Sequence, residues 1–438
     1  MPGAFDSGFD SGFDLSGVAP PASGGEGFIR VEIAFTSQAN PDAWNLGLDA
    51  FPVTLGDALT EAWTDVTPFA KSLSINRGKA RELDAYQVGR CSVGLQNILR
   101  RFDPLNLDGP YVEAGETLVK PGKPMRVIAT DPTDDVEYPL FRGTITDWGL
   151  DYSGAFNAIT TATASDALAL LPTAGINYTT SSAFTGVVVS QLLEEAGISQ
   201  NVIDVGDVLA QGMTWTGTLA QALRNLEQTE QGHLYSPPDG GITYRERGYA
   251  AYDPRATTSQ ASFGATGLPY ESIALSYDSD AIKNKARVTR RGGTRQEFAN
   301  VDSIAEYGER LITLTDLACL DDAAAEALAE FVVDQRGDPK VRIDSIVCAP
   351  IRSPEVLTTA ISTRILDRIT VDFIPPGATS PYSQDVFVIG IAHSWTPPGA
   401  MRTTFRFMPV GLYAGPWWVL GVGELGDTEG PTVTRLGV

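Results

Sequence analysis

Phe28-Ile29-Arg30-Val31-Glu32-Ile33-Ala34-Phe35 is the stretch at which the hydrophobic period becomes two. Its odd-numbered residues are apolar and alternate with Arg30 and Glu32, the pattern of a β-strand with one buried face. The pattern returns at 73–75, 91–95, 125–127 and 141–145, separated by turn residues at Asn76-Arg77-Gly78, Asp108-Gly109-Pro110 and Pro121-Gly122. Many short alternating strands of this kind predict a sandwich or barrel, and we assign it to residues 28–164.

The region that follows, residues 165–265, has a different pattern. Val187–Ala196 and Thr218–Gln231 carry apolar residues at helical spacing, and each segment ends at a glycine, which predicts two amphipathic helices. A turn at 237–240 then leads into a strand at 242–245, which we expect to form an edge hairpin. This region is therefore predicted to be a small α+β insertion domain.

Strands resume towards the C-terminus. Residues 266–350 are predicted to form a second β domain with one helix at Asp321–Arg336, and 351–415 a β segment that completes the core. We predict that 369–373 or 386–395 packs with part of 28–150, because the first strands need closure to avoid open edges. Residues 416–438 are expected to be an extended tail. The fold class is thus β-rich α+β, with tube-like β-sandwich or barrel domains and a small α+β insertion.

Residues 1–27 are too polar and glycine-rich to hold a core, so we predict a flexible N-terminal arm. Phe-Asp-Ser-Gly occurs twice in it and is followed by Phe-Asp, which places Phe5, Phe9 and Phe13 four residues apart. The arm is either a disordered leader or a docking peptide with repeated anchors for a neighbour. Its first residues do not have the pattern of a secretion signal.

The charge balance is strongly acidic, with 32 Lys and Arg against 54 Asp and Glu and a net charge of −22. Such a surface repels phosphate, and we expect the basic cluster at 283–295 to be a solvated hairpin face that binds no nucleic acid. Cys91, Cys319 and Cys348 are expected to be reduced and mostly buried. No apolar stretch is long enough for a membrane-spanning helix, so no membrane insertion is predicted.

The sequence predicts no catalytic, cofactor-binding or metal-binding residues and no cofactor. It has two histidines: His233, expected at a helix end, and His393, expected in the core of a strand. Asp134-Asp135 is expected in a hairpin loop and Asp321-Asp322 at a helix start, where Asp favours the helix dipole. No nucleotide-binding or hydrolase motif accompanies these residues.

Several local motifs carry a family resemblance. They run from Leu73-Ser74-Ile75-Asn76-Arg77-Gly78-Lys79-Ala80-Arg81-Glu82-Leu83-Asp84 through Arg101-Phe102-Asp103-Pro104, Pro121-Gly122-Lys123-Pro124 and Leu140-Phe141-Arg142-Gly143 to Asp367-Arg368-Ile369-Thr370-Val371 and Gly390-Ile391-Ala392-His393. Their succession over about 28–410 resembles the minor tail proteins of long-tailed, siphovirus-like phages of actinobacteria. More narrowly, it is similar to the tail-tip or baseplate hub, also called the tail-associated protein.

We interpret these motifs as scaffold chemistry. Arg77-Gly78 and Pro121-Gly122 are expected to form turns, and Arg81 and Glu82 to pair across a loop. The side chains of Asn97 and Asp103 are expected to form hydrogen bonds with backbone groups of turns.

The resemblance implies a structural hub in the virion tail tip that is assembled in the host cytoplasm. It is expected to be a homotrimer whose chains each carry two tube-like β domains. Such a ring would close the distal end of the tail tube and let phage DNA pass without specific binding. The implied partners are the distal tail protein, the tape-measure protein, and other minor tail or receptor-binding proteins. The alternatives are a distal tail ring or adaptor protein, expected as a hexamer, and a cell-wall hydrolase, for which the chain offers no credible site.

Overall fold

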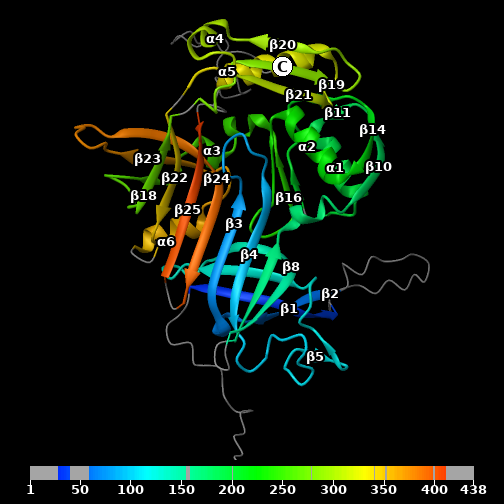
Figure 1. Cartoon of the computed structure of the whole chain (residues 1–438), viewed down its shortest axis with the longest axis vertical. Coiled ribbons are helices and arrows are strands. Elements are labelled where there is room, and N and C mark those ends of the chain that lie inside the picture. Colours follow the sequence, from blue (N-terminus) through cyan, green and yellow to red (C-terminus); the bar gives the residue numbers. More distant parts are fainter. Residues whose placement is uncertain are drawn as a thin grey trace, which may run out of the picture.

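In this computed structural model, residues 28–39, 59–153, 158–199, 201–277, 279–339, 341–350, 353–397 and 400–410 are described. Thirteen of the described strands belong to one sheet, in the order β18-β22-β25-β24-β3-β4-β9-β8-β7-β1-β2, with β23 pairing with β24 and β17 with β23 (Figure 1). Its strands are β1 (Ile29–Ala39), β2 (Leu59–Asp65), β3 (Ala70–Gly78), β4 (Gln87–Gln96), β7 (Pro124–Thr130), β8 (Glu137–Tyr152), β9 (Ala158–Ser165), β17 (Ser262–Phe263), β18 (Ser272–Ser276), β22 (Arg342–Cys348), β23 (Arg368–Phe373), β24 (Tyr382–Thr396) and β25 (Ala400–Pro409).

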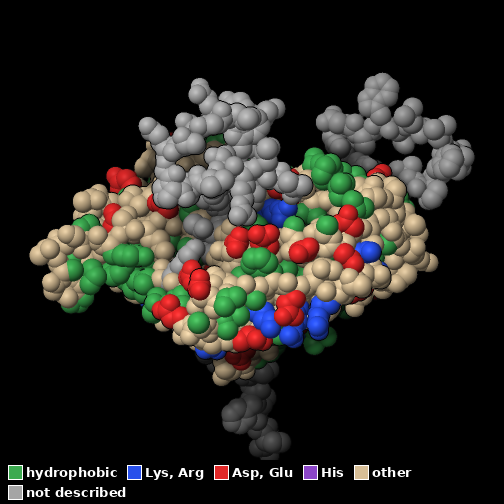
Figure 2. All heavy atoms as spheres, turned by 90° about the horizontal axis from the view of Figure 1, so that it is seen from above, with side chains coloured by type: hydrophobic (Ala, Val, Ile, Leu, Met, Phe, Trp, Pro, Cys, Tyr) green, Lys and Arg blue, Asp and Glu red, His purple; other side chains and the backbone are tan. Residues whose placement is uncertain are grey.

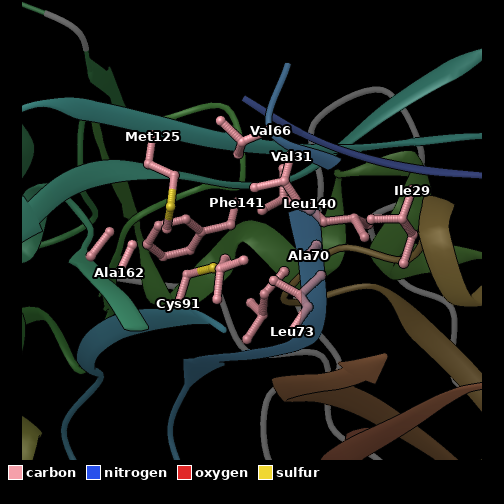
Figure 3. Close-up of a cluster of buried hydrophobic side chains, with 14 of the residues drawn as sticks. Ile29, Val31, Val66, Ala70, Leu73, Cys91, Met125, Leu140, Phe141 and Ala162 are labelled. Carbon is pink, nitrogen blue, oxygen red and sulfur yellow. The ribbon is translucent and has the colours of Figure 1, made fainter. Parts of the chain in front are cut away.

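The N-terminal core is enclosed by β1, β3, β4, β7, β8 and β9. Ile29, Val31, Ile33 and Phe35 are all buried in it, as their alternation predicts. Figure 3 shows the ring of Phe141 in the middle of this core, with Met125, Cys91 and Ala162 from other strands around it. Side chains from six strands converge on a single core, so this part of the sheet curls around its own apolar face. A short hairpin of β5 (Val112–Glu113) and β6 (Glu116–Thr117) and the 3-10 helix η2 (Thr67–Phe69) lie in the connections.

The C-terminal core is formed on β17, β22, β23, β24 and β25, with Phe263, Phe387 and Phe405 among its fully buried side chains. Strand β24 continues directly into the N-terminal half of the sheet, because His393 pairs with Ile75 and Trp395 with Leu73 of β3. Trp395 is also buried in the N-terminal core. The prediction that 369–373 or 386–395 packs with part of 28–150 is therefore confirmed, by 386–395.

Helix α6 (Pro354–Ser362) lies between these two cores. Its Val356 and Ala360 pack in the C-terminal core, whereas Leu357 and Ile361 pack in the N-terminal core. The sequence analysis did not anticipate this helix. Ser353 caps it by accepting a hydrogen bond from the Val356 N–H.

The insertion core is built around α1 (Thr185–Glu195) and α2 (Leu219–Glu230), which correspond to the two predicted helices. Thr218 and Gln221 form a capping box at the start of α2, and Gln231 ends the helix in the left-handed conformation. The remaining elements are η3 (Ala167–Leu170), β10 (Gly175–Thr180), β11 (Ala183–Phe184), β12 (Asn201–Ile203), β13 (Leu209–Ala210), β14 (Met213–Thr218), β15 (His233–Tyr235), β16 (Ile242–Arg245), η4 (Arg247–Ala251) and α3 (Pro254–Thr257).

A fourth, smaller core lies at the opposite end of the molecule from β1 and β2 (Figure 1). It consists of β19 (Lys285–Arg290), β20 (Gln296–Ala299) and β21 (Leu311–Leu317), which pack against α5 (Asp322–Arg336). Helix α4 (Val301–Tyr307) follows β20 and precedes β21 in the chain. Helix α5 matches the predicted helix, and Asp321 caps it through the Ala324 N–H.

The β-rich α+β class is confirmed, with a large antiparallel sheet as its main element. Two local predictions were wrong. Asn76-Arg77-Gly78 is not a turn, because these residues end β3 and pair with β24 and β4. The 242–245 strand is not at an edge, since β16 lies between β12 and β15. The arm at 1–27 and the tail at 416–438 lie outside the described residues.

Gly78 shows why β3 and β24 can approach so closely. Its φ is +94°, and a Cβ atom there would lie 2.3 Å from the backbone oxygen of Ile389. A larger residue would force the strands apart at the point where the two β cores join. Arg77 precedes Gly78 in β3 and pairs with Ile391 of β24, so it lies at the same junction.

Candidate functional site

The residues predicted as anchors of the arm, Phe5, Phe9 and Phe13, lie outside the described residues. Both histidines are buried in the fold. His393 Nδ1 lies 3.0 Å from Thr403 Oγ1, and burial lowers the pKa of His393 to about 3. His233 was expected at a helix end but is the first residue of β15, three residues after α2 ends at Glu230. Burial together with Lys79 and Arg336 holds its pKa well below the usual value. Both rings are therefore neutral core residues at neutral pH.

The paired aspartates occupy the predicted local positions. Asp134 and Asp135 lie in the exposed turn between β7 and β8, where the Val136 N–H donates to Asp134. Asp321 caps α5, and Asp322 in its first turn accepts hydrogen bonds from Arg290 and Thr294. Each carboxylate serves turn or helix structure.

Four of the six basic residues at 283–295 form ion pairs with neighbouring carboxylates. Lys285 and Arg287 pair with Glu297 at 3.0 and 2.7 Å, Arg290 pairs with Asp322, and Arg291 pairs with Asp316. Figure 2 views the molecule from the end that carries these strands, and its Lys and Arg side chains lie among Asp and Glu side chains. No continuous basic surface is visible on the described part of this face.

Cys91, Cys319 and Cys348 are free and buried, as predicted. The part of the chain that the structure describes holds no group of three or more His, Cys, Asp or Glu side chains arranged to hold a metal ion. Among its helices, none is long and apolar enough to cross a membrane.

A cavity of about 280 Å³ opens where the insertion core meets the two β cores. Its walls come from the end of β3, the start of β8, the β15–β16 hairpin, η4 and the turn between α6 and β23. Aromatic and proline side chains form much of the wall, including Tyr138, Tyr235, Pro237 and Pro238. The wall is thus mixed, because about half of its residues are polar or charged, with four arginines and three aspartates among them.

Arg77 is the polar side chain that distinguishes this cavity. It is 4% exposed, and neither its Nε nor its Nη1 has a hydrogen-bond partner among the described residues. Asp166 acts on it electrostatically, but that carboxylate accepts hydrogen bonds from the Gly89 and Leu168 N–H groups instead. Burial lowers the pKa of Arg77 to about 10, so the side chain remains charged at neutral pH.

The cavity wall has three other arginines, Arg245, Arg255 and Arg364, and the first two are already paired. Arg245 Nη1 lies 2.9 Å from Asp204 Oδ1, and Arg255 binds both carboxylate oxygens of Asp367 at 2.6 and 2.5 Å. For Arg77 no hydrogen bond to a carboxylate is present among the described residues, although the charges of Asp166 and Asp239 act on it. The sequence analysis missed it by assigning Arg77 to a turn, although Leu73, Ile75 and Arg77 share one phase of the strand.

A second polar cluster joins the cores beside β3. Glu82 Oε1 accepts a hydrogen bond from Arg336 Nε at 3.2 Å, and Arg342 lies 3.8 Å from Oε2. Lys79 Nζ donates to the Glu82 backbone oxygen at 2.8 Å. The predicted pairing of Arg81 with Glu82 was wrong, because Glu82 turns inward to residues more than 250 positions away.

The loop after β4 presents exposed apolar side chains from a fixed backbone. Asn97 Oδ1 accepts from the Phe102 N–H and Asp103 Oδ1 from the Leu105 N–H, both at 2.8 Å, which confirms the predicted role of Asn97 and Asp103. Phe102 is fully buried and anchors the loop. Leu99, Leu105 and Leu107 are 53%, 78% and 57% exposed.

Neither a protein-family profile nor a curated protein matches the sequence. Solved structures do share the fold. The tail protein from Neisseria meningitidis MC58 is 11% identical, with a TM-score of 0.55 over 88% of this chain and 97% of its own. The 43 kDa tail protein of prophage MuSo2 from Shewanella oneidensis is 13% identical, with a TM-score of 0.55 over 89% of this chain and 98% of its own. The chain therefore has the fold of these two tail proteins over almost their full length.

Proposed function

We propose that this chain is a structural subunit of a phage tail, and more specifically the tail-tip hub of a siphovirus-like actinobacteriophage. The observation that carries the proposal is the shared fold with two tail proteins, which extends over nine-tenths of this chain and nearly all of theirs. The ordered succession of hub-like motifs supports the finer assignment. In this proposal the chain has no catalytic role and acts in the virion after assembly in the host cytoplasm.

The arrangement of the two β cores supports a trimeric ring. Each chain carries an N-terminal and a C-terminal core on one continuous sheet, so three chains would supply six β units around an axis. Such a ring could continue a sixfold tail tube and close its distal end. The domain boundaries predicted from the sequence are kept as part of this proposal.

The exposed leucines of the loop after β4 are a suitable contact surface for a neighbouring tail subunit. A contact with a neighbour would bury the apolar surface of Leu99, Leu105 and Leu107. Burial of apolar surface is the main driving force of association. We propose the distal tail protein, the tape-measure protein and other minor tail or receptor-binding proteins as partners. The distal ring remains the alternative role.

The charge distribution supports passage of DNA without specific binding. The net charge is −22, and the arginines and lysines of β19 are paired with carboxylates. This strand therefore offers few unpaired cations to DNA phosphates. Each cation that binds a phosphate would increase the affinity for DNA and slow its passage. We propose a lumen that is acidic or neutral, with Arg290 and Arg291 away from the DNA path.

Subunit counting and localisation together test the role. Native mass spectrometry of the purified chain should give a trimer, whereas a hexamer would favour the distal ring. Gold-labelled antibodies against the chain should bind the tail tip of intact virions. Labelling elsewhere on the virion, or none, would refute the hub assignment.

A further inference from the structure

The cavity around Arg77 has the chemistry of a receptor for a carboxylate beside an aromatic ring. Arg77 lines the cavity, and its Nε and Nη1 have no hydrogen-bond partner among the described residues, whereas Arg245 and Arg255 are bound to Asp204 and Asp367. A buried charge without a partner is costly, and a guanidinium binds a carboxylate through two parallel hydrogen bonds. Tyr235 and Pro237 provide apolar wall beside it.

The N-terminal arm carries this combination three times. Asp6, Asp10 and Asp14 each follow a phenylalanine directly. The repeat offers the same pair of groups in three registers, and the proposal allows any one of them to enter the cavity. The repeat is also acidic, as a ligand for an unpaired arginine should be.

The arm joins the fold close to the cavity. Ile29 of β1 pairs with Ala129 of β7, and Ala129 pairs in turn with Tyr138 of β8, a residue of the cavity wall. Two strand spacings place Ile29 about 10 Å from Tyr138. The chain from Asp14 to Phe28 can span roughly 45–50 Å when extended. Every Phe-Asp unit can therefore reach the cavity, and the short tether gives it a high local concentration.

We propose that the cavity binds a Phe-Asp unit of the N-terminal arm of the same chain, with the aspartate carboxylate on Arg77 and the phenyl ring against Tyr235 and Pro237. In this proposal, the site at which the arm docks is the cavity around Arg77. The inference does not depend on the proposed tail function, because it follows from the cavity and from the tether alone.

Disulfide trapping in the full-length chain tests the proposal. Ser11→Cys places a thiol next to Asp10 in the arm, and Ser362→Cys places one on the cavity wall, while the three native cysteines are buried. The rate of disulfide formation is measured in oxidised glutathione at low protein concentration. We expect this pair to close at least tenfold faster than the same pair in a chain with Asp6, Asp10 and Asp14 changed to Asn. Arg77→Met should slow closure to the same extent.

A control pair separates docking from mere proximity. Asp134→Cys lies in the exposed turn beside the point where the arm joins β1, but it does not line the cavity. Its closure with Ser11→Cys should not slow in the Asn variants, because an arm released from the cavity reaches this turn at least as readily. Equal closure at Ser362 with and without the arm aspartates would overturn the proposal. A disulfide between two chains would also overturn it, by assigning the arm to a neighbouring copy. The Asn variants keep the test decisive even where Arg77→Met does not fold.

Discussion

Replacing Glu82 by alanine should destabilise the protein far more than removal of an ordinary ion pair. The Glu82 and Arg336 side chains are 5% and 7% exposed, and their contact joins the loop after β3 to the end of α5. Arg342 and Lys79 lie beside the same glutamate. Its removal would leave several buried cations without their shared carboxylate.

The expected loss is about 3–5 kcal/mol of the free energy of unfolding, the usual effect of removing one partner of a buried ion pair. Urea unfolding followed by circular dichroism measures this loss. Asp316→Ala is the matched control, because Asp316 also binds an arginine through two contacts but is 58% exposed. That variant should lose no more than about 1 kcal/mol.

A second variant tests the cause of the loss. Glu82→Leu combined with Arg336→Met removes both charges and replaces them with apolar groups, so it should recover part of the stability lost in Glu82→Ala. If Glu82→Ala and Asp316→Ala have equal effects, Glu82 is not the charge partner that this reasoning requires. A double variant as unstable as Glu82→Ala would show that packing, and not charge, determines the loss.

Three further predictions concern pH and assembly. Burial lowers the pKa of Lys79 from 10.5 to about 8. Below pH 8 the buried charge of Lys79 destabilises the folded state in full, and the free energy of unfolding should rise by about 3 kcal/mol as the pH increases from 8 to 10.5. In Lys79→Met this rise should be absent. The pKa of His393 is lowered to about 3. Below pH 6.5 the imidazole of His393 is protonated in the unfolded chain but not in the folded one, so the free energy of unfolding should fall by up to about 5 kcal/mol between pH 6.5 and 3. In acid titrations His393→Gln should lack this fall. Leu105→Ser with Leu107→Ser should leave the melting temperature within a few degrees but reduce incorporation into tails at least tenfold, and unchanged incorporation would remove this loop from the contact surface.

Much of the fold could be predicted from the sequence because its signals are local. Alternation from Ile29 to Phe35 fixes which face of β1 is buried, and the capping residues Thr218 and Asp321 mark the starts of α2 and α5. These patterns depend on neighbours within a few residues. The closure of the N-terminal strands by a C-terminal segment was also predictable, because a set of strands without closure leaves open edges, but the sequence did not say that β3 would be the strand that pairs with β24.

The cavity and the Glu82 cluster could not be predicted in the same way. Arg77-Gly78 has the composition of a turn, and only its pairing with β24 keeps it in a strand. Glu82 contacts Arg336 across 254 positions, whereas Arg81 is its neighbour in sequence. A single sequence carries no signal for such long-range contacts. Helix α6 is nine residues long, and its two apolar faces serve different cores, so it lacks the one-sided pattern of the predicted helices.

The buried charges of this protein lie where its cores meet, and this placement has a mechanical consequence. The two β cores share β24 and α6, so they cannot rotate against each other without breaking a strand ladder and apolar packing. The attachment of the smaller core includes Glu82 with Arg336 and hydrogen bonds such as Asn225 Nδ2 to the Asp316 backbone oxygen, beside a short β-bridge between Ala210 and Cys319. Polar contacts of this kind depend on geometry and lose their stabilising effect once they are displaced. The sheet is thus the rigid part of the subunit, and any movement during assembly should occur first between the sheet and the core of β19, β20, β21 and α5.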